Sequence, residues 1–230
     1  MSIIVRNLSE QIFDVVREQI VAGKLPLDRA IRQDALASEL GVSKIPLREA
    51  LARLEQEGLL VSQANRGFFV RPMCAEDAEE IFALRLAIEP GAVAAAALAA
   101  NAEDQQEARD ALAQLDEAAS AHLDDVARRN RIFHMALVRP SHRVLTTHLI
   151  ERLQVLAERY VLKHLEPAGR EDRAHLEHEV LLDAWISRDA DHARSLAAAH
   201  IQATLADLRR QLRGDEGAMG RPPLRHGERI

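Results

Sequence analysis

The sequence predicts a mainly α-helical protein with a small β-hairpin near its N-terminus and an all-α helical bundle after it. Apolar residues recur at helical spacing through most of the 230 residues. Two short apolar runs before residue 72 flank a polar stretch, and from residue 75 to 213 the pattern is helical throughout. A chain of this length usually divides into two domains, so we place the boundary after residue 72.

The first segment reads as three helices. The first carries apolar residues at helical spacing and ends near Gly23. Those residues are Leu8, Ile12, Val15, Val16 and Ile20. A second helix is expected at 32–40, and Gly41 supplies a turn before a third helix. Ser43 is placed to cap this third helix, which runs to about Glu57. The order of helix, tight turn and helix is that of a helix-turn-helix.

A hairpin is expected directly after the third helix. The runs 59–61 (Leu-Leu-Val) and 68–70 (Phe-Phe-Val) flank the polar stretch 62–67 and predict two short strands. A hairpin in this position is the wing of a winged helix-turn-helix. Pro72 closes this predicted domain, which spans 1–72.

The second predicted domain spans 73–213 and consists of helices alone. Breaks at Asn101, Pro140, Pro167 and Asp189 separate the helical segments. The expected helices are 76–100, 104–119, 122–138, 141–164, 171–187 and 190–213. Six such helices form a bundle. The final segment, 214–230, is rich in Gly and Pro and is expected to be a disordered tail.

Composition and charge narrow the class of protein. Hydrophobic residues make up 47% of the chain and charged residues 29%, as in a globular protein with a real core. The single cysteine, Cys74, excludes an internal disulfide, and no uncharged apolar run suits a membrane span or a signal peptide, so a cytoplasmic location is expected. Residues 1–72 contain 10 Lys and Arg against 9 Asp and Glu, and the remainder contains 20 against 27. Only the first domain is therefore compatible with DNA.

The third helix has the pattern of a recognition helix. Leu47, Leu51 and Leu54 share one stripe and leave Lys44 and Arg48 on the opposite face. Arg and Lys on such a helix donate to guanine edges or to phosphates in the major groove, and the helix N-terminus at Ser43 suits a phosphate. Arg66, at the hairpin tip, is placed to reach the flanking groove. On an isolated helix, these charges would be read as a solvated face.

This segment resembles the winged-helix domain of GntR-type bacterial regulators. The similarity lies in "RQDALASELGVSKIPLREALARLEQEGLLVSQANRGFFV" (32–70). The resemblance implies operator contact or its support by a set of six residues. They are Ser43, Lys44, Pro46, Arg48, Arg66 and Gly67. Lys44 stands where arginine is commoner in the family, and Asp34 stands where some relatives carry a basic or polar residue.

Three of the ten histidines lie on apolar helical stripes, and we expect them to face the core. They are His134, His178 and His200. Six other histidines lie on polar faces or in the tail and are not expected to function. Those are His122, His148, His164, His175, His192 and His226. A single buried histidine is more often a hydrogen-bonded core residue than a ligand, but three together favour a site.

The spacing of the last two histidines supports a shared site. His178 and His200 are 22 residues apart, with Asp189 at the midpoint in a predicted turn between antiparallel helices. At about 1.5 Å per residue, both lie roughly 16 Å from that turn on facing helices. Asn130 and His134, one turn apart, can add ligands from a third helix. Three imidazoles and an oxygen suit Zn²⁺ or Ni²⁺ with coordination positions left open.

The second domain resembles the FadR C-terminal (FCD) ligand-binding domain. The similarity lies in "RLAIEPGAVAAAALAA" (85–100), "NRIFHMAL" (130–137) and "EHEVLLDAWISRDADHARSLAAAHI" (177–201). The resemblance implies that the three histidines bind a metal, and that Asn130 occupies a position where metal-binding members usually have Asp. Arg85 matches the arginine of the opening helix, where it either holds a ligand carboxylate or forms a salt bridge with Glu89.

These observations predict a homodimeric DNA-binding transcriptional regulator, a repressor, whose operator affinity is controlled by a small carboxylate at the metal site. Three alternatives stay open at this point. The ion itself could be the signal, the histidines could be core residues, or the site could hydrolyse a substrate. The hydrolase is disfavoured because no motif of the H-E-x-x-H type places a general base beside the histidines. We therefore expect no enzyme activity.

Overall fold

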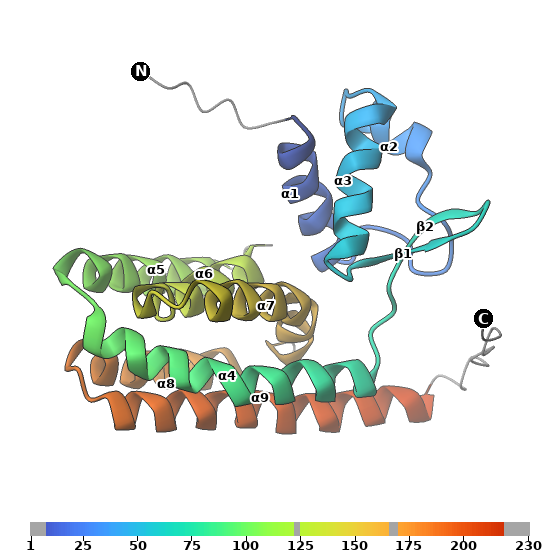
Figure 1. The fold of residues 1–230 in the computed structure, drawn as a ribbon. Coiled ribbons are helices and arrows are strands. Elements are labelled where there is room, and N and C mark those ends of the chain that lie inside the picture. Colours follow the sequence, from blue (N-terminus) through green and yellow to red (C-terminus); the bar gives the residue numbers. More distant parts are fainter. Residues whose placement is uncertain (1–7, 122–124, 166–169, 219–230) are drawn as a thin grey trace, which may run out of the picture.

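The computed structural model describes residues 8–121, 125–165 and 170–218, except for the side chains of 162–165, 170–172 and 213–218. The N-terminal part contains three α-helices and a two-stranded antiparallel hairpin (Figure 1). Its elements are α1 (Leu8–Val21), α2 (Gln33–Glu39), α3 (Lys44–Gln56), β1 (Leu60–Gln63) and β2 (Gly67–Val70). The predicted helix-turn-helix with a wing is confirmed.

The core of the N-terminal part lies between α1 and α3. Leu47, Leu51 and Leu54 of α3 are fully buried, as the apolar stripe predicts. On α1, Ile12, Val16 and Ile20 are buried, together with Phe13. Two residues assigned to the α1 stripe, Leu8 and Val15, are exposed instead. The stripe is narrower than expected because only one side of α1 faces α3.

The turn and the hairpin depend on a few special backbone conformations. Gly41, between α2 and α3, has a φ of +65°, which glycine adopts at little cost. Ser43 occupies the N-cap position of α3 with extended dihedrals, but its side chain makes no capping hydrogen bond, so the expected cap is only positional. The hairpin pairs Leu60 with Val70 and Gln63 with Gly67. β1 is therefore shifted toward the turn relative to the run 59–61, whereas β2 begins one residue before the run 68–70 and ends with it.

The helical part contains six α-helices and one short 3-10 helix within the described residues. They are α4 (Ala75–Ala99), α5 (Ala102–Ser120), α6 (Val126–Ala136), η1 (Arg139–Ser141), α7 (Val144–Leu165), α8 (Arg170–Ile186) and α9 (Ala190–Ala218). Figure 1 shows α4, α8 and α9 in one layer, with α5, α6 and α7 in a second layer. The predicted all-helical bundle is confirmed.

Three helices differ from the prediction by three or more residues at one end, and the others agree within two residues. The helix expected at 122–138 begins at Val126, with 122–124 outside the described residues, and ends at Ala136. The following helix starts at Val144 rather than 141, because η1 and the left-handed His142 (φ +53°) intervene. The last helix continues to Ala218, five residues into the predicted tail, and the rest of that tail, 219–230, lies outside the described residues.

The helix α4 packs against α7, α8, α9 and η1 of this part. By length and composition alone it could cross a membrane, but 56% of its most apolar 18-residue stretch is buried inside the fold. It lies along α9 and also contacts α7, so its apolar residues are those of a core helix (Figure 1). This stretch contains Arg85 and Glu89, so it is not an uncharged apolar run, and its burial accounts for its apolar composition.

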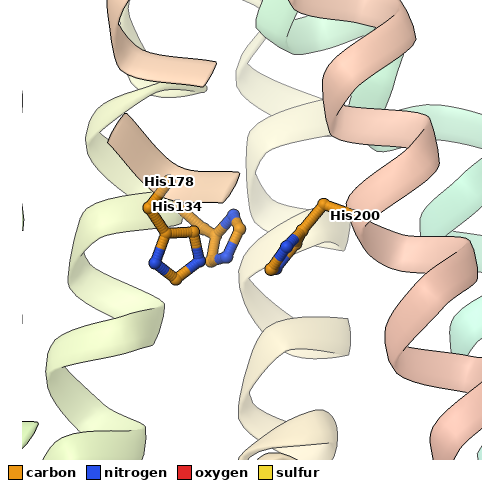
Figure 2. A group of neighbouring side chains, drawn as sticks. All are labelled: His134, His178 and His200. Carbon is orange, nitrogen blue, oxygen red and sulfur yellow. The ribbon is translucent and has the colours of Figure 1, made fainter. Parts of the chain in front are cut away.

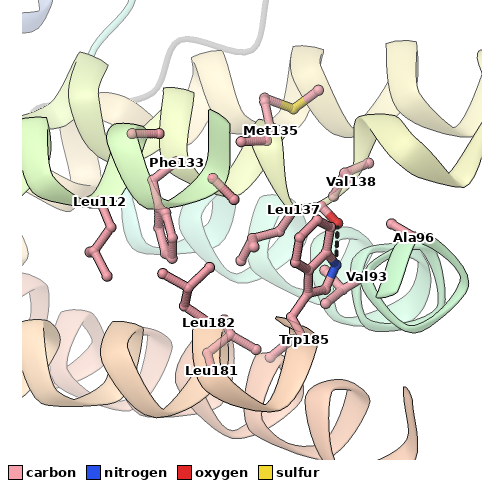
Figure 3. Packing of buried hydrophobic residues seen from close by; sticks show 14 of the residues in the cluster. Val93, Ala96, Leu112, Phe133, Met135, Leu137, Val138, Leu181, Leu182 and Trp185 are labelled. Atoms are coloured by element: carbon pink, nitrogen blue, oxygen red, sulfur yellow. Dashed lines mark hydrogen bonds between the residues drawn. The ribbon is translucent and has the colours of Figure 1, made fainter. Parts of the chain in front are cut away.

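The main core fills the space between the two layers (Figure 3). Trp185 of α8 and Phe133 of α6 are fully buried there. The indole Nε1 of Trp185 donates a hydrogen bond of 3.1 Å to the carbonyl oxygen of Leu137. Because a buried indole N–H without a partner is costly, this bond holds α8 in place against the end of α6.

The two parts are joined through α7. Val155 of α7 belongs to the apolar core of the N-terminal part, and Leu156 packs against it. The guanidinium of Arg152 donates to the carbonyl oxygen of Gln56, and that of Arg159 donates to the carbonyl oxygen of Arg71. One helix of the bundle therefore contributes directly to the core and the backbone hydrogen bonds of the N-terminal part.

Candidate functional site

The predicted DNA-reading surface is accessible. Lys44, Ile45 and Arg48 of α3 are exposed on the face opposite its buried leucines, and Ile45 has 73% of its surface free. Lys44 forms an ion pair with Asp34 of α2, so part of its charge is balanced before any contact with DNA. Arg48 therefore stands as the main candidate for base contact on this face.

The hairpin tip presents the other predicted residues of the surface. Arg66 is exposed, and its guanidinium carbon lies 5.5 Å from the centre of the Phe69 ring. Gly67 has a φ of +94°, which side chains rarely adopt, so glycine is required at this point of the wing. Pro46 is half-buried in the first turn of α3, where it supports the helix rather than presenting a polar group.

The three predicted histidines converge in the helical part (Figure 2). His134 comes from α6, His178 from α8 and His200 from α9. Their ring centres are 5.2 Å (134–178), 5.2 Å (134–200) and 4.7 Å (178–200) apart. His178 and His200 face each other across the turn before α9, as their equal distance from Asp189 predicts.

Two of the three rings have a carboxylate beside their Nδ1 atom. Nδ1 of His200 lies 2.7 Å from a carboxylate oxygen of Glu177, and Nδ1 of His134 lies 3.6 Å from one of Glu89. The Nε2 atoms of His134 and His178 are buried and have no hydrogen-bond partner among the described residues. Unsatisfied buried nitrogens are costly, so this arrangement calls for a ligand.

Burial also sets the protonation of two of these rings. It holds the pKa of His134 and of His178 well below the usual value of about 6.5, and the neighbouring His200 lowers both further. Both imidazoles are therefore neutral near pH 7, with a lone pair available. A neutral imidazole is the form that binds metals.

The donor set fits a divalent transition metal. One nitrogen from each histidine lies within 4.8 Å of the other two. The carboxylates of Glu177 and Glu89 stand beside the outer nitrogens of His200 and His134, where such groups orient metal ligands. Asn130 is buried one turn before His134 and lines the same cavity, so its amide oxygen is available as a further donor. Imidazole nitrogen with an oxygen suits Zn²⁺ or Ni²⁺.

Arg85 lies in the same cavity, and its charge is already balanced. Its guanidinium donates to both carboxylate oxygens of Glu89, the closer at 2.9 Å, and both side chains are almost fully buried. Gln154 of α7 donates a further hydrogen bond of 2.8 Å to Glu89. Of the two roles considered for Arg85, the structure shows the salt bridge, while contact with an effector stays a prediction.

The cavity beside the histidines has a volume of about 40 Å³ and walls that are mainly apolar. Leu115, Val126 and Val161 contribute to these walls. Asp116 of α5 and His175 of α8 also line it, with Nδ1 of His175 2.8 Å from the Asp116 carboxylate. The cavity thus offers a polar pair in addition to the histidine cluster.

Sequence reasoning missed several residues of this site. The sequence places His175 on a polar face, but the structure shows that it lines the cavity. Its position three residues before His178 puts both on one side of α8, which is the signal that could have identified it. Glu89 and Glu177 could not be paired with their histidines by spacing, because each contact joins two different helices. The predictions for His122 and His226, and for the side chain of His164, lie outside the described residues.

Two family models match the chain. Residues 80–203 match the FCD domain, and residues 8–70 match the model of bacterial regulatory proteins of the gntR family. The first match covers the helices that carry the histidine cluster, and the second covers the N-terminal part from α1 to β2.

Individual proteins are similar over nearly the whole chain. The transcriptional regulator BphR of Paraburkholderia xenovorans (strain LB400) is 33% identical over 89% of this chain and 86% of its own length. The transcriptional repressor GlaR of Escherichia coli (strain K12) is 28% identical over 87% of this chain and 95% of its own. The solved structure of E. coli McbR/YncC has a TM-score of 0.77 at 27% identity, covering 89% of this chain and 98% of that one.

Proposed function

The chain belongs to the GntR family of bacterial transcriptional regulators and carries their FCD domain, and on this premise we propose that it is a cytoplasmic repressor controlled by a small carboxylate. The effector binds at a metal-containing site formed by His134, His178 and His200. The observation that carries this proposal is the convergence of three histidines with two unsatisfied buried nitrogens beside a cavity.

The charges in the cavity favour a carboxylate that binds the ion directly. Arg85 is neutralised by Glu89, so a bound divalent cation would supply the main uncompensated positive charge. The apolar walls suit a short carbon skeleton, and the Asp116–His175 pair suits a hydroxyl group on it. This chemistry describes a short hydroxy acid.

The DNA contacts are assigned to the exposed face of α3 and the hairpin tip. Lys44, Arg48 and Arg66 supply the positive charge there, Ser43 supplies the helix N-terminus, and Pro46 and Gly67 shape the two elements. A helix-turn-helix of this size usually binds a symmetric operator as a dimer. Val144, Leu145 and Leu149 form an exposed apolar face on α7, which we assign to contact with a second copy of the chain.

The test begins with metal. Protein prepared without a histidine tag is dialysed against Zn²⁺ or Ni²⁺, and one bound ion per chain is expected. The double variant His178→Ala, His200→Ala should lose it, whereas a double replacement of the exposed His148 and His192 should retain it. Absence of stoichiometric metal in the wild-type protein contradicts the site.

The second step screens hydroxy acids, sugar acids and dicarboxylates by thermal shift, with and without metal. Ligands that bind only in the presence of metal support the proposal. Ligands that bind equally well to the His178→Ala, His200→Ala variant show that the ion does not hold the effector. A change of operator affinity with metal alone, and with no effector, identifies the ion itself as the signal.

A further inference from the structure

Three buried charges connect the histidine-bearing helix α6 to the N-terminal part. Glu158 of α7 accepts a hydrogen bond from Nε of Arg131 on α6, and its other carboxylate oxygen lies 3.9 Å from Nε of Arg17 on α1. The three residues expose only 2% (Glu158), 9% (Arg131) and 7% (Arg17) of their surfaces. We call this set the Glu158 relay.

The two arms of the relay differ. The Arg131 arm is a hydrogen-bonded ion pair, whereas Nε of Arg17 is buried without a hydrogen-bond partner in the described structure. Nη2 of Arg17 also lies 3.7 Å from Asp14 within α1. Glu158 is thus held firmly by α6 and loosely by α1, so a small shift of its carboxylate can make or break the bond to Arg17.

A gain in stability does not by itself explain why three charged residues are buried at this junction. Removing charges from water costs free energy that their mutual attraction often fails to recover, and apolar residues of similar size frequently serve as well. The same junction already has apolar contacts, because Val155 of α7 lies in the core of the N-terminal part. The charges therefore need another explanation, and their position suggests one.

The relay starts at the proposed effector site. Arg131 directly follows Asn130 and precedes His134 by three residues, and both of these line the cavity from α6. A second route reaches α7 from the same site, because Glu89 lies 3.6 Å from His134 and accepts a hydrogen bond from Gln154. Gln154 and Glu158 are one turn apart, so both routes meet on α7.

We propose that Glu158 is the positioning residue that transmits the state of the histidine site to α1 of the DNA-binding part. The inference rests on the proposed function, since it supplies the regulation of that site. An ion held by side chains from α6, α8 and α9 constrains α6, and with it Arg131. The carboxylate of Glu158 follows Arg131, and its contact with Arg17 changes the placement of α1.

The test measures hydrogen–deuterium exchange of the full chain with and without Zn²⁺, which serves as the probe. Zn²⁺ should slow exchange in α1 by about fivefold more than in α3, the size of a modest coupling between sites. The comparison with α3 removes the effect of general stabilisation, because opening of the whole N-terminal part exposes both helices. Arg17→Met should abolish this excess slowing of exchange in α1 relative to α3. Zn²⁺ uptake and the slowed exchange in α6 should persist.

Arg17→Met leaves the Glu158–Arg131 pair intact, so Glu158 keeps its main partner in this variant. Two further variants distinguish loss of the relay from a general loss of stability. Glu158→Gln removes the negative charge that attracts both arginines and should also abolish the excess slowing of exchange in α1. Glu18→Gln is the matched control: Glu18 of α1 lies 3.4 Å from Arg128 of α6, so it joins the same two helices, but this pair is partly exposed and should transmit nothing.

The outcomes are distinct. An excess that survives in Arg17→Met, or that is missing in the wild-type protein with Zn²⁺ bound, overturns the relay. Protein that takes up no Zn²⁺ overturns the metal site and the relay together. A further outcome is a protein that shows the excess slowing of α1 with Zn²⁺ and yet selects no DNA from a randomised pool. That result overturns the proposed control of an operator but leaves the relay in place.

Discussion

The histidines of the cluster differ in what holds them. His200 has a carboxylate partner in Glu177, whereas His178 relies on packing against Phe133, whose ring centre is 4.9 Å away. His134 lies between these cases, with Glu89 at 3.6 Å. His134 and His178 lack a close carboxylate partner, and their buried Nε2 atoms make no hydrogen bond within the described structure. Both should therefore respond most to protonation and to a ligand.

Acid should destabilise the metal-free protein through these two rings. Their folded pKa lies below the usual 6.5, so the unfolded chain takes up protons as pH falls past about 6.5 and the folded chain does not. The free energy of unfolding therefore falls by about 1.4 kcal/mol per pH unit for each ring, until its folded pKa is reached. Denaturant unfolding in EDTA at pH 7.5 and 5.5 measures this loss.

The pH test has an internal comparison. His178→Gln should reduce the loss of stability between the two pH values, because one buried titrating ring is gone. The same replacement at His148, which is exposed on α7, should leave the pH dependence as in the wild-type protein. Equal pH dependence in His178→Gln and the wild-type protein contradicts the assigned burial effect.

Asn130 offers a direct test of the fourth ligand position. Asn130→Asp should tighten Zn²⁺ binding on the order of tenfold, which corresponds to about 1.4 kcal/mol, because an anionic oxygen replaces a neutral one. Without metal, the same variant should be less stable than the wild-type protein, since its new charge is buried. Isothermal titration with Zn²⁺ and unfolding in EDTA give the two readouts. Unchanged affinity removes Asn130 from the ligand set.

Arg48 should carry most of the specific operator contact. Arg48→Ala is expected to cost about 1–3 kcal/mol of binding to a selected operator and to relax its sequence preference. Arg53→Ala is the matched control on the same helix, because Arg53 packs over Phe13 at 4.3 Å rather than facing the recognition surface. Gel-shift titration measures the operator affinity of both variants. Equal affinity and equal sequence preference in Arg48→Ala and Arg53→Ala contradict the assignment of α3 as the recognition helix.

Among the helices, α7 has the most varied set of contacts. Its N-terminal turns expose Val144, Leu145 and Leu149, its middle enters the core of the N-terminal part, and its later residues contact the segment before α4. In that last region, Tyr160 donates its hydroxyl hydrogen to the carbonyl oxygen of Cys74 at 3.3 Å. Burial raises the pKa of Tyr160 to about 12, so this donor stays protonated at physiological pH.

The exposed end of α7 should carry the dimer contact. Leu145 has 80% of its surface free, an unusual exposure for leucine beside Val144 and Leu149. If the wild-type protein forms the proposed dimer in light scattering, Leu145→Asp is expected to give monomers at the same concentration. Leu176→Asp, at an exposed leucine of α8, should leave the dimer intact. A Leu145→Asp protein that stays dimeric places the interface elsewhere.

At the scale of the whole molecule, the cavity and the predicted DNA-reading surface belong to different parts that meet at α7. Apolar contacts of Val155, backbone contacts of Arg152 and Arg159, and the Glu158 relay all cross this junction. A ligand that changes α6 or α4 therefore has a physical path to the position of α3. Coupling of this kind requires only that the ligand bind two arrangements with different affinities.

Effector binding should release the operator. A hundredfold loss of DNA affinity corresponds to about 2.7 kcal/mol of differential binding, which one metal bond and one charged hydrogen bond can supply. Gel shifts with metal-loaded protein, at increasing concentration of a screened carboxylate, measure the change. His178→Ala, His200→Ala protein should bind the operator without responding. Tighter DNA binding in the presence of the carboxylate would make it a corepressor and reverse the proposed direction.

Much of this protein follows from local sequence. Helical spacing, Gly41 and the two apolar runs predict the helix-turn-helix, the wing and six further helices, because periodicity and turn chemistry act over a few residues. The equal spacing of His178 and His200 from Asp189 predicts their meeting, since an antiparallel helix pair fixes which residues lie opposite.

Contacts between helices distant in sequence were decided only by the tertiary structure. The approach of Glu177 to His200, the approach of Glu89 to His134, and the placement of His175 in the cavity wall depend on how the helices are rotated about their axes. The link from Arg131 through Glu158 to Arg17 depends on three helices at once. Periodicity identifies the face of a helix that is buried, but the partner of each side chain on that face is chosen by packing.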